Sequence, residues 1–173
     1  KSRQSIYPNE FNGQIIPENI ILELLENANH APTHKMTQPW MFKIFCGDSK
    51  TQLLKEIIKE KEILEKKKEK LKDNFKKSSH IICVCMKKNN HLLPEWEEIS
   101  ATAMAVQNIW ISCAGSNIGG YWSTPKYANK LESYLSLNED ETCLGFFYLG
   151  VHNSKKIRNI KRKNIHEKIQ WFR

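Results

Sequence analysis

Between residues 29 and 40 the chain gathers hydrogen-bonding side chains into one short segment. Its sequence, Asn-His-Ala-Pro-Thr-His-Lys-Met-Thr-Gln-Pro-Trp, includes two imidazoles, two hydroxyls and two amides. An apolar run at helical spacing ends just before the segment, and an alternating run begins at Trp40, so we expect a loop between a helix and a strand. Such loops commonly hold a ligand against a rigid frame. The alternative is an ordinary polar loop that follows a helix end.

Two other segments carry groups that complement this loop. Arg3 and Ser5 can act as an anion clamp, because a guanidinium presents forked donors and a hydroxyl adds one more. The alternative for them is a frayed terminus. Gly119-Gly120 allows close backbone approach, and Tyr121 to Thr124 add aromatic planes and hydroxyls. Together the three segments suit flavin mononucleotide (FMN), which has a phosphate, ribityl hydroxyls and an isoalloxazine ring.

Other kinds of site lack their usual residues. His30 and His34 are four positions apart, but Pro32 between them prevents one helix face from presenting both to a metal. The chain has no Gly-x-Ser-x-Gly nucleophile elbow and no Walker-type loop. Gly119-Gly120 is too short for a dinucleotide fingerprint. We therefore expect neither a metal site nor a hydrolytic triad.

The length and composition indicate a single domain over residues 1–173. A chain of 173 residues buries roughly 70% of the surface that it exposes when unfolded, so it needs no disulfide or metal to fold. The five cysteines lack paired spacing, which favours free thiols in a reducing compartment. No segment is long and apolar enough to span a bilayer. We expect a cytoplasmic protein with no membrane partner.

The net charge of +8 is concentrated in two places. Residues 55–72 hold eight lysines and five glutamates, and residues 155–163 hold six basic residues and no acid. The first segment predicts one or two amphipathic helices with a solvated face. The alternative is a nucleic-acid-binding module, but no aromatic residue is interleaved with these lysines before Phe75. We expect no nucleic-acid partner.

The hydrophobic pattern places these segments on a mixed set of elements. Helices are expected from Pro17 to residue 28, within residues 50–77, over residues 95–116 and from Pro125 to residue 135, and strands over residues 40–46, 80–86 and 142–151. Residues 117–125 are expected to form a loop. The small residues of the helix at 95–116 indicate that it is central and buried. The predicted fold is α+β, a sheet flanked by helices.

Taken together, these segments resemble the nitroreductase family, specifically its compact single-domain bacterial subfamily. Arg3-Gln4-Ser5 matches an N-terminal Arg-Arg-Ser, and residues 31–40 match an Ala-Pro-Ser/Thr…Gln-Pro-Trp motif. Residues 94–98 with the following Ala-rich helix, residues 118–123 and residues 145–150 match later family segments in order and spacing. Two positions depart from the pattern. Gln4 replaces the second Arg, and Met36 replaces the Asn that is common in larger nitroreductases.

The resemblance implies a homodimer whose long central helix lies at the dimer interface, with FMN in each of two interface sites and NADH or NADPH as electron donor. Carried over by position, the cofactor-binding residues are Arg3, Gln4, Ser5, His30, Thr33, His34, Trp122, Ser123, Thr124 and Arg162. Arg162 would meet the phosphate, and Trp122, Ser123 and Thr124 would line the ring. The terminal Trp171-Phe172 pair is expected to pack onto another surface, such as a second subunit.

The implied activity is an FMN-dependent, ping-pong oxidoreduction. A hydride passes from NAD(P)H to the flavin, and two electrons then pass to a small aromatic acceptor of nitroaromatic or quinone type. No side chain is required as acid or base, so we expect no catalytic residue, because FMN would carry the chemistry. The alternative is another flavin reaction on the same fold, such as dehalogenation or flavin breakdown.

Overall fold

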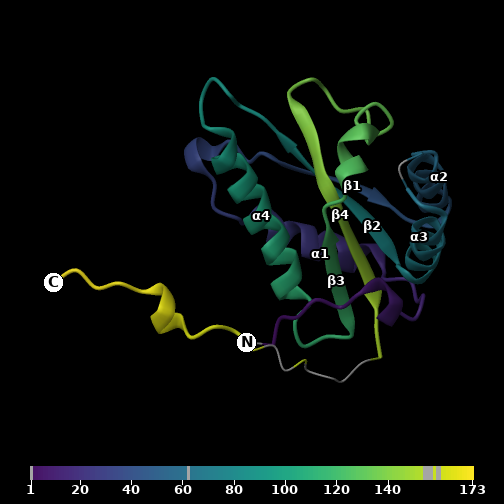
Figure 1. The fold of residues 1–173 in the computed structure, drawn as a ribbon, viewed down its shortest axis with the longest axis horizontal. Coiled ribbons are helices and arrows are strands. Elements are labelled where there is room, and N and C mark those ends of the chain that lie inside the picture. The colour runs from purple at the N-terminus through teal and green to yellow at the C-terminus, as the bar shows by residue number, and fades with distance from the viewer. Residues whose placement is uncertain (1, 62, 154–157, 159–160) are drawn as a thin grey trace.

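The computed structural model describes residues 2–61, 63–153, 158 and 161–173. Its centre is a four-stranded antiparallel sheet in the order β1-β2-β4-β3 (Figure 1). The strands are β1 (Trp40–Phe45), β2 (His80–Lys87), β3 (Ile118–Ser123) and β4 (Glu141–Val151). The α-helices are α1 (Glu18–Asn29), α2 (Gly47–Ile58), α3 (Glu65–Lys77) and α4 (Glu95–Ser112). Short 3-10 helices are η1 (Pro8–Glu10), η2 (His34–Met36), η3 (Lys126–Leu131) and η4 (Ile165–Lys168). The expected α+β class is confirmed.

The sheet separates two hydrophobic cores because successive strand residues point to opposite faces. Ile82 and Val84 of β2 pack with α1 and α4, whereas Ile81, Cys83 and Cys85 pack on the opposite side, with α2 and α3. All of these β2 side chains are fully buried. The prediction that this strand is buried on both faces is therefore confirmed.

The segment that was expected to be a loop, residues 117–125, instead contains the edge strand β3. The prediction assumed that Gly119-Gly120 frees the backbone, but both glycines have ordinary strand backbone and pair with β4. Their role is steric: a Cβ on Gly120 would overlap the Phe147 ring, and one on Gly119 would overlap Ile6. Glycine marks a close approach here rather than a turn.

The N-terminal segment crosses the free edge of β3. The Ile6 amide donates to the Gly120 carbonyl at 3.1 Å, and the Trp110 indole donates to the same carbonyl at 3.0 Å. Arg3 lies on the α4 side, its guanidinium 4.9 Å from the Trp110 ring centroid. Tyr7 lies on the α3 side, where its ring contacts Tyr121 at 4.8 Å. The segment therefore connects the two faces of the sheet.

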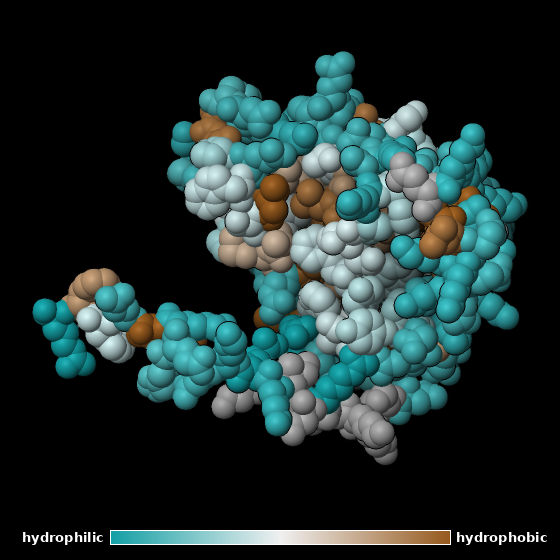
Figure 2. Space-filling model, in the orientation of Figure 1, coloured by the Kyte–Doolittle hydropathy of each residue, from teal (hydrophilic) through white to brown (hydrophobic). Residues whose placement is uncertain are grey.

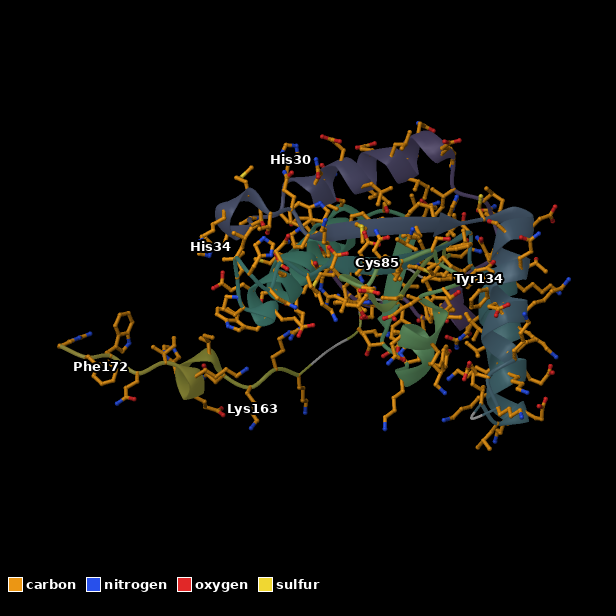
Figure 3. The ribbon with its side chains drawn as sticks, turned by 90° about the horizontal axis from the view of Figure 1, so that it is seen from above. His30, His34, Cys85, Tyr134, Lys163 and Phe172 are labelled. Carbon is orange, nitrogen blue, oxygen red and sulfur yellow. The ribbon has the colours of Figure 1, made fainter. Side chains whose placement is uncertain are left out.

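The C-terminal residues extend away from the body of the molecule (Figure 1). Ile165, Trp171 and Phe172 are 61%, 74% and 86% exposed. Figure 3 shows Lys163 and Phe172 on this tail, well separated from the sheet. The basic run at residues 155–163 lies partly outside the described residues. In the described part of the chain, no helix is long and apolar enough to cross a membrane.

We predict that Gly120→Ala destabilises the fold by about 1–3 kcal/mol, the usual cost of overpacking a core. The added methyl group would displace the Phe147 ring, which is fully buried. The measurement is urea denaturation followed by circular dichroism. Gly115→Ala is a useful comparison, because an added Cβ at Gly115 meets no atom within 4 Å. Any loss of stability in that variant comes from the positive φ of +87° and not from overpacking. A Gly120→Ala variant as stable as the parent would contradict the steric role.

Candidate functional site

The site begins at a cavity of about 940 Å³ on the α3 side of the sheet. Ser123 and Thr124, which the sequence singled out, line this cavity at the end of β3. Neither hydroxyl makes a hydrogen bond to any described residue, so both remain available to a ligand. The volume is at the upper end of the range for small-molecule sites.

Four tyrosines form the walls and floor of this cavity: Tyr7, Tyr121, Tyr127 and Tyr148. The rings of Tyr121 and Tyr148 lie 6.4 Å apart, and Tyr148 is only 3% exposed. Burial raises the pKa of Tyr127 to about 12 and raises the pKa of Tyr148 further, so both phenols are neutral at physiological pH. The Tyr148 hydroxyl makes no hydrogen bond to a described residue. The cavity therefore offers aromatic faces and a hydroxyl that is available for a hydrogen bond.

Lysines stand at the rim of the cavity. Lys67 and Lys70 come from α3, and Lys126 comes from η3. The sequence alone suggested that the lysines of α3 form a solvated face, and it did not single out these positions. The signal that could have found them is their i, i+3 spacing, which places Lys67 and Lys70 on one face of the helix. The rim gives the cavity a positive potential.

Arg3, Gln4 and Ser5 lie near a tail cation that sequence reasoning did not name individually. The Arg158 guanidinium donates to the Ser5 carbonyl at 3.0 Å, and the Arg158 amide donates to Gln4 Oε1 at 2.9 Å. The same guanidinium pairs with Glu10 and lies 4.7 Å from the Tyr7 ring centroid. In the sequence, only the basic run at residues 155–163 indicated that a cation from the tail would lie near Arg3 and Ser5. Arg162, the position carried over from the family, is exposed on the tail.

The donor-rich loop lies at the other end of the molecule, where hydrogen bonds close it on itself. The Trp40 indole donates to Asn29 Oδ1 at 3.2 Å, joining the two ends of the segment. Thr33 Oγ1 accepts from the Gln38 amide at 3.1 Å and lies 3.1 Å from Thr37 Oγ1. The Thr33 hydroxyl thus organises the loop.

Both loop histidines are exposed and lie beside acids. His34 Nδ1 lies 2.6 Å from Glu97 Oε2, at the first turn of α4, and His30 Nε2 lies 3.8 Å from Glu26 Oε1. In Figure 3 His30 and His34 stand where α1 ends, away from the sheet. The loop is therefore fixed to α4 while its imidazoles stay accessible.

Backbone strain is concentrated in this loop. Lys35, Met36 and Gln38 have φ values of 50°, 55° and 45°, in the left-handed region that non-glycine residues rarely adopt. Each such residue costs of order 1 kcal/mol, and such residues cluster at functional sites. Among the described residues, only Ser136 is a further non-glycine case. The loop geometry thus supports a functional role for this segment.

The structure does not bring all the predicted residues together within one chain. Glu97, beside His34, and Trp110, beside Arg3, are separated by thirteen residues of α4, which is about 20 Å of helix. Trp122 points to the α4 side of the sheet, opposite the tyrosine-lined cavity. Its indole nitrogen is buried and has no acceptor among the described residues. Within one chain the site is therefore two separate halves.

The fold and these motifs have counterparts among known proteins. The model of the nitroreductase family matches residues 1–151. A Bacillus subtilis protein provisionally named NAD(P)H nitroreductase YfhC is 24% identical over 149 residues, covering 82% of this chain and 76% of the relative. A nitroreductase-like family protein from Bacillus cereus has a TM-score of 0.86 at 22% identity and covers 99% of this chain and 92% of its own.

A second similar structure is the FMN-dependent nitroreductase NfnB from Mycobacterium smegmatis, solved in complex with NADPH. Its TM-score is 0.76 at 16% identity, with 99% of this chain and 96% of NfnB covered. The likeness to the solved structures shows the fold, and the family model adds the sequence pattern over most of the chain. The expectation drawn from the motifs is confirmed: the chain belongs to the nitroreductase family.

Proposed function

We propose that the protein is an FMN-dependent oxidoreductase that takes electrons from NADH or NADPH and passes them to a small nitroaromatic or quinone acceptor by a ping-pong mechanism. The observation that carries the proposal is the cavity beside Ser123 and Thr124, which joins aromatic walls, free hydroxyls and lysines in a nitroreductase fold. When bound, FMN supplies the hydride and electron transfer.

The residues around the cavity suit the ring of this cofactor. Tyr7 and Tyr121 offer aromatic faces, and the Ser123 and Thr124 hydroxyls offer hydrogen bonds. The rim lysines would offer positive charge to a bound cofactor, and preorganised charge of this kind would stabilise a reduced, anionic ring. No side chain in this arrangement needs to act as a general acid or base.

The phosphate would be held around the edge of β3, where the N-terminal segment crosses from the cavity at Tyr7 to the α4 side at Arg3. The Arg3 guanidinium makes no hydrogen bond to a described residue and is available to an anion. Ser5 adds a hydroxyl, and Arg158 adds a second guanidinium beside it. Arg158 is therefore a candidate for the tail cation alongside Arg162, and Gln4 fixes the tail near this end through the Arg158 amide.

The two halves of the site can be completed by a second copy of the chain. If two α4 helices pack antiparallel about a two-fold axis, His30, Thr33 and His34 of one copy approach the Arg3 end of the other. Such an arrangement overcomes the separation of about 20 Å along α4. The homodimer therefore explains why the family motifs lie at opposite ends of one helix.

The exposed face of α4 supports this dimer. Trp96, Ile99, Met104 and Ile111 are 65%, 40%, 40% and 53% exposed. Figure 2 shows apolar side chains gathered between α4 and the sheet, in contrast to the mostly hydrophilic surface over α2 and α3. An exposed apolar stripe on a helix is typical of an interaction surface. The exposed tail residues Trp171 and Phe172 would pack on the same dimer.

The first prediction from this proposed function is optical. Purified protein should be yellow, or turn yellow with added FMN, and should bleach with NADH or NADPH under anaerobic conditions. The measurement is the visible absorption spectrum before and after donor addition. A colourless protein that takes up no FMN would refute the proposed function.

The second prediction concerns the phosphate. Arg3→Ala should weaken FMN binding by about 1.5–3 kcal/mol, the scale of a hydrogen bond to a charged group. Flavin fluorescence quenching measures the dissociation constant. Arg158→Ala and Arg162→Ala tested in parallel identify the tail cation, because only the variant that loses a phosphate contact should show a comparable loss. Unchanged affinity in Arg3→Ala would remove that residue from the site.

The third prediction concerns the dimer. Met104→Glu places a charge in the middle of the exposed α4 face and should shift the protein from dimer to monomer, with loss of bound flavin. Light scattering coupled to size exclusion measures the mass. Leu64→Glu is the matched control, because Leu64 is 68% exposed on the opposite side of the sheet. A Met104→Glu variant that keeps both its dimer mass and its flavin would argue against this interface.

A further inference from the structure

We infer that the cavity beside Ser123 and Thr124 selects aromatic acceptors that carry a negative charge, such as a carboxylate, over neutral ones of the same shape. The inference rests on the proposed function and adds the charge class of the acceptor to it. The observations behind it are the position and pairing of the rim lysines and the chemistry of the cavity floor.

The rim lysines come from two sides of the cavity. Lys67 and Lys70 lie on α3, and Lys126 follows Pro125 at the start of η3. None of the three makes an ion pair with a described residue. Asp73 is the acid among the lining residues, and it pairs with Lys77 at 2.9 Å. The charge that faces the cavity is therefore positive and uncompensated by its lining.

Other lysines of the same helix behave differently. Lys68 pairs with Glu65 at 2.8 Å, Lys72 with Glu69 at 2.6 Å, and Lys77 with Asp73 at 2.9 Å. None of these lysines lines the cavity. The acids of α3 thus neutralise lysines away from the cavity and leave Lys67 and Lys70 to act on a ligand.

The floor of the cavity defines the other part of the ligand. The Tyr121 and Tyr148 rings provide an aromatic surface, and the Tyr148 hydroxyl, which bonds to no described residue, provides a hydrogen-bonding group. At about 940 Å³ the cavity has room for a second aromatic molecule beside a flat cofactor ring. An aromatic ring with an anionic substituent fits both features of the cavity. The ring can pack against the tyrosines, and the negative charge can pair with the lysines.

The kinetic test compares two acceptors of similar shape, 4-nitrobenzoate and 4-nitrobenzyl alcohol, with the FMN-loaded protein. We expect a lower KM for 4-nitrobenzoate at low ionic strength, and the advantage should shrink as salt is added, because salt screens exposed charges. In Lys67→Ala/Lys126→Ala, the ratio of the two KM values should change by roughly two- to tenfold in the direction of the neutral acceptor. The ratio cancels any change in flavin content common to both reactions.

The matched control is Lys72→Ala, which removes a lysine of the same helix that does not line the cavity. It should leave the KM ratio unchanged. An equal KM for the two acceptors in the parent protein, or an equal shift in Lys72→Ala and in the double variant, would overturn the inference.

A binding measurement separates the failure of this inference from the failure of the proposed function. Quenching of intrinsic tyrosine and tryptophan fluorescence gives the dissociation constants of both compounds without turnover. Tighter binding of 4-nitrobenzoate that disappears in the double variant supports the inference even if the protein holds no FMN. If the protein holds FMN and turns over both acceptors but binds them equally, the proposed function stands and the charge preference is wrong.

Discussion

The carbonyl oxygen of Gly120 is the point at which three parts of the molecule meet. It accepts hydrogen bonds from the Ile6 amide and from the Trp110 indole while its strand pairs with β4. An edge strand leaves one row of backbone groups unpaired, and here the N-terminal segment and α4 satisfy part of that row. The missing side chain of Gly120 also makes room for Phe147. The position of Arg3, Ser5 and Tyr7 follows from this one anchor.

These hydrogen bonds to the Gly120 carbonyl also explain why the candidate site lies at the edge of the sheet rather than inside it. The centre of the sheet is occupied by two dense cores, which leave no space for a ligand. Around β3 several of the neighbouring elements are short: the N-terminal segment, η1 and η3. Polar and aromatic groups from both faces can reach a ligand at such an edge. The chemistry of the site is thus assembled from loops and strand ends on a rigid frame.

Local patterns were enough to predict most of the fold. The helical periodicity from Pro17 to residue 28, the small residues within residues 95–116 and the apolar run at residues 80–86 each reflect burial against neighbouring elements, which is visible in a single stretch of sequence. Strand β3 was missed because its glycines serve packing against Phe147 and Ile6, which are distant in sequence. A glycine pair usually indicates a turn. Only the tertiary contacts with Phe147 and Ile6 show that these glycines make room for neighbouring side chains.

In the candidate site, too, some residues could be predicted from local sequence, whereas others depend on tertiary contacts. Ser123 and Thr124 were predicted from their hydroxyls and from the resemblance, and the structure places both at the cavity that we propose for the cofactor. Lys67, Lys70 and Lys126 were not found, because the charge pattern along α3 cannot distinguish a lysine that faces a cavity from one that faces water. Arg158 lies in a run of similar cations, and its contacts with Ser5 and Glu10 join residues 153 and 148 positions apart, which no local pattern can reveal.

The three left-handed residues of the loop at residues 33–38 have a consequence for how the protein opens. Their conformation is held by the Thr33 bond and by the tie between Asn29 and Trp40, rather than by the preference of Lys35, Met36 or Gln38. Breaking those few bonds releases the strain, so local opening costs less here than in the strands. Amide hydrogens of this loop would therefore exchange earlier than those of the strands, while the sheet remains intact.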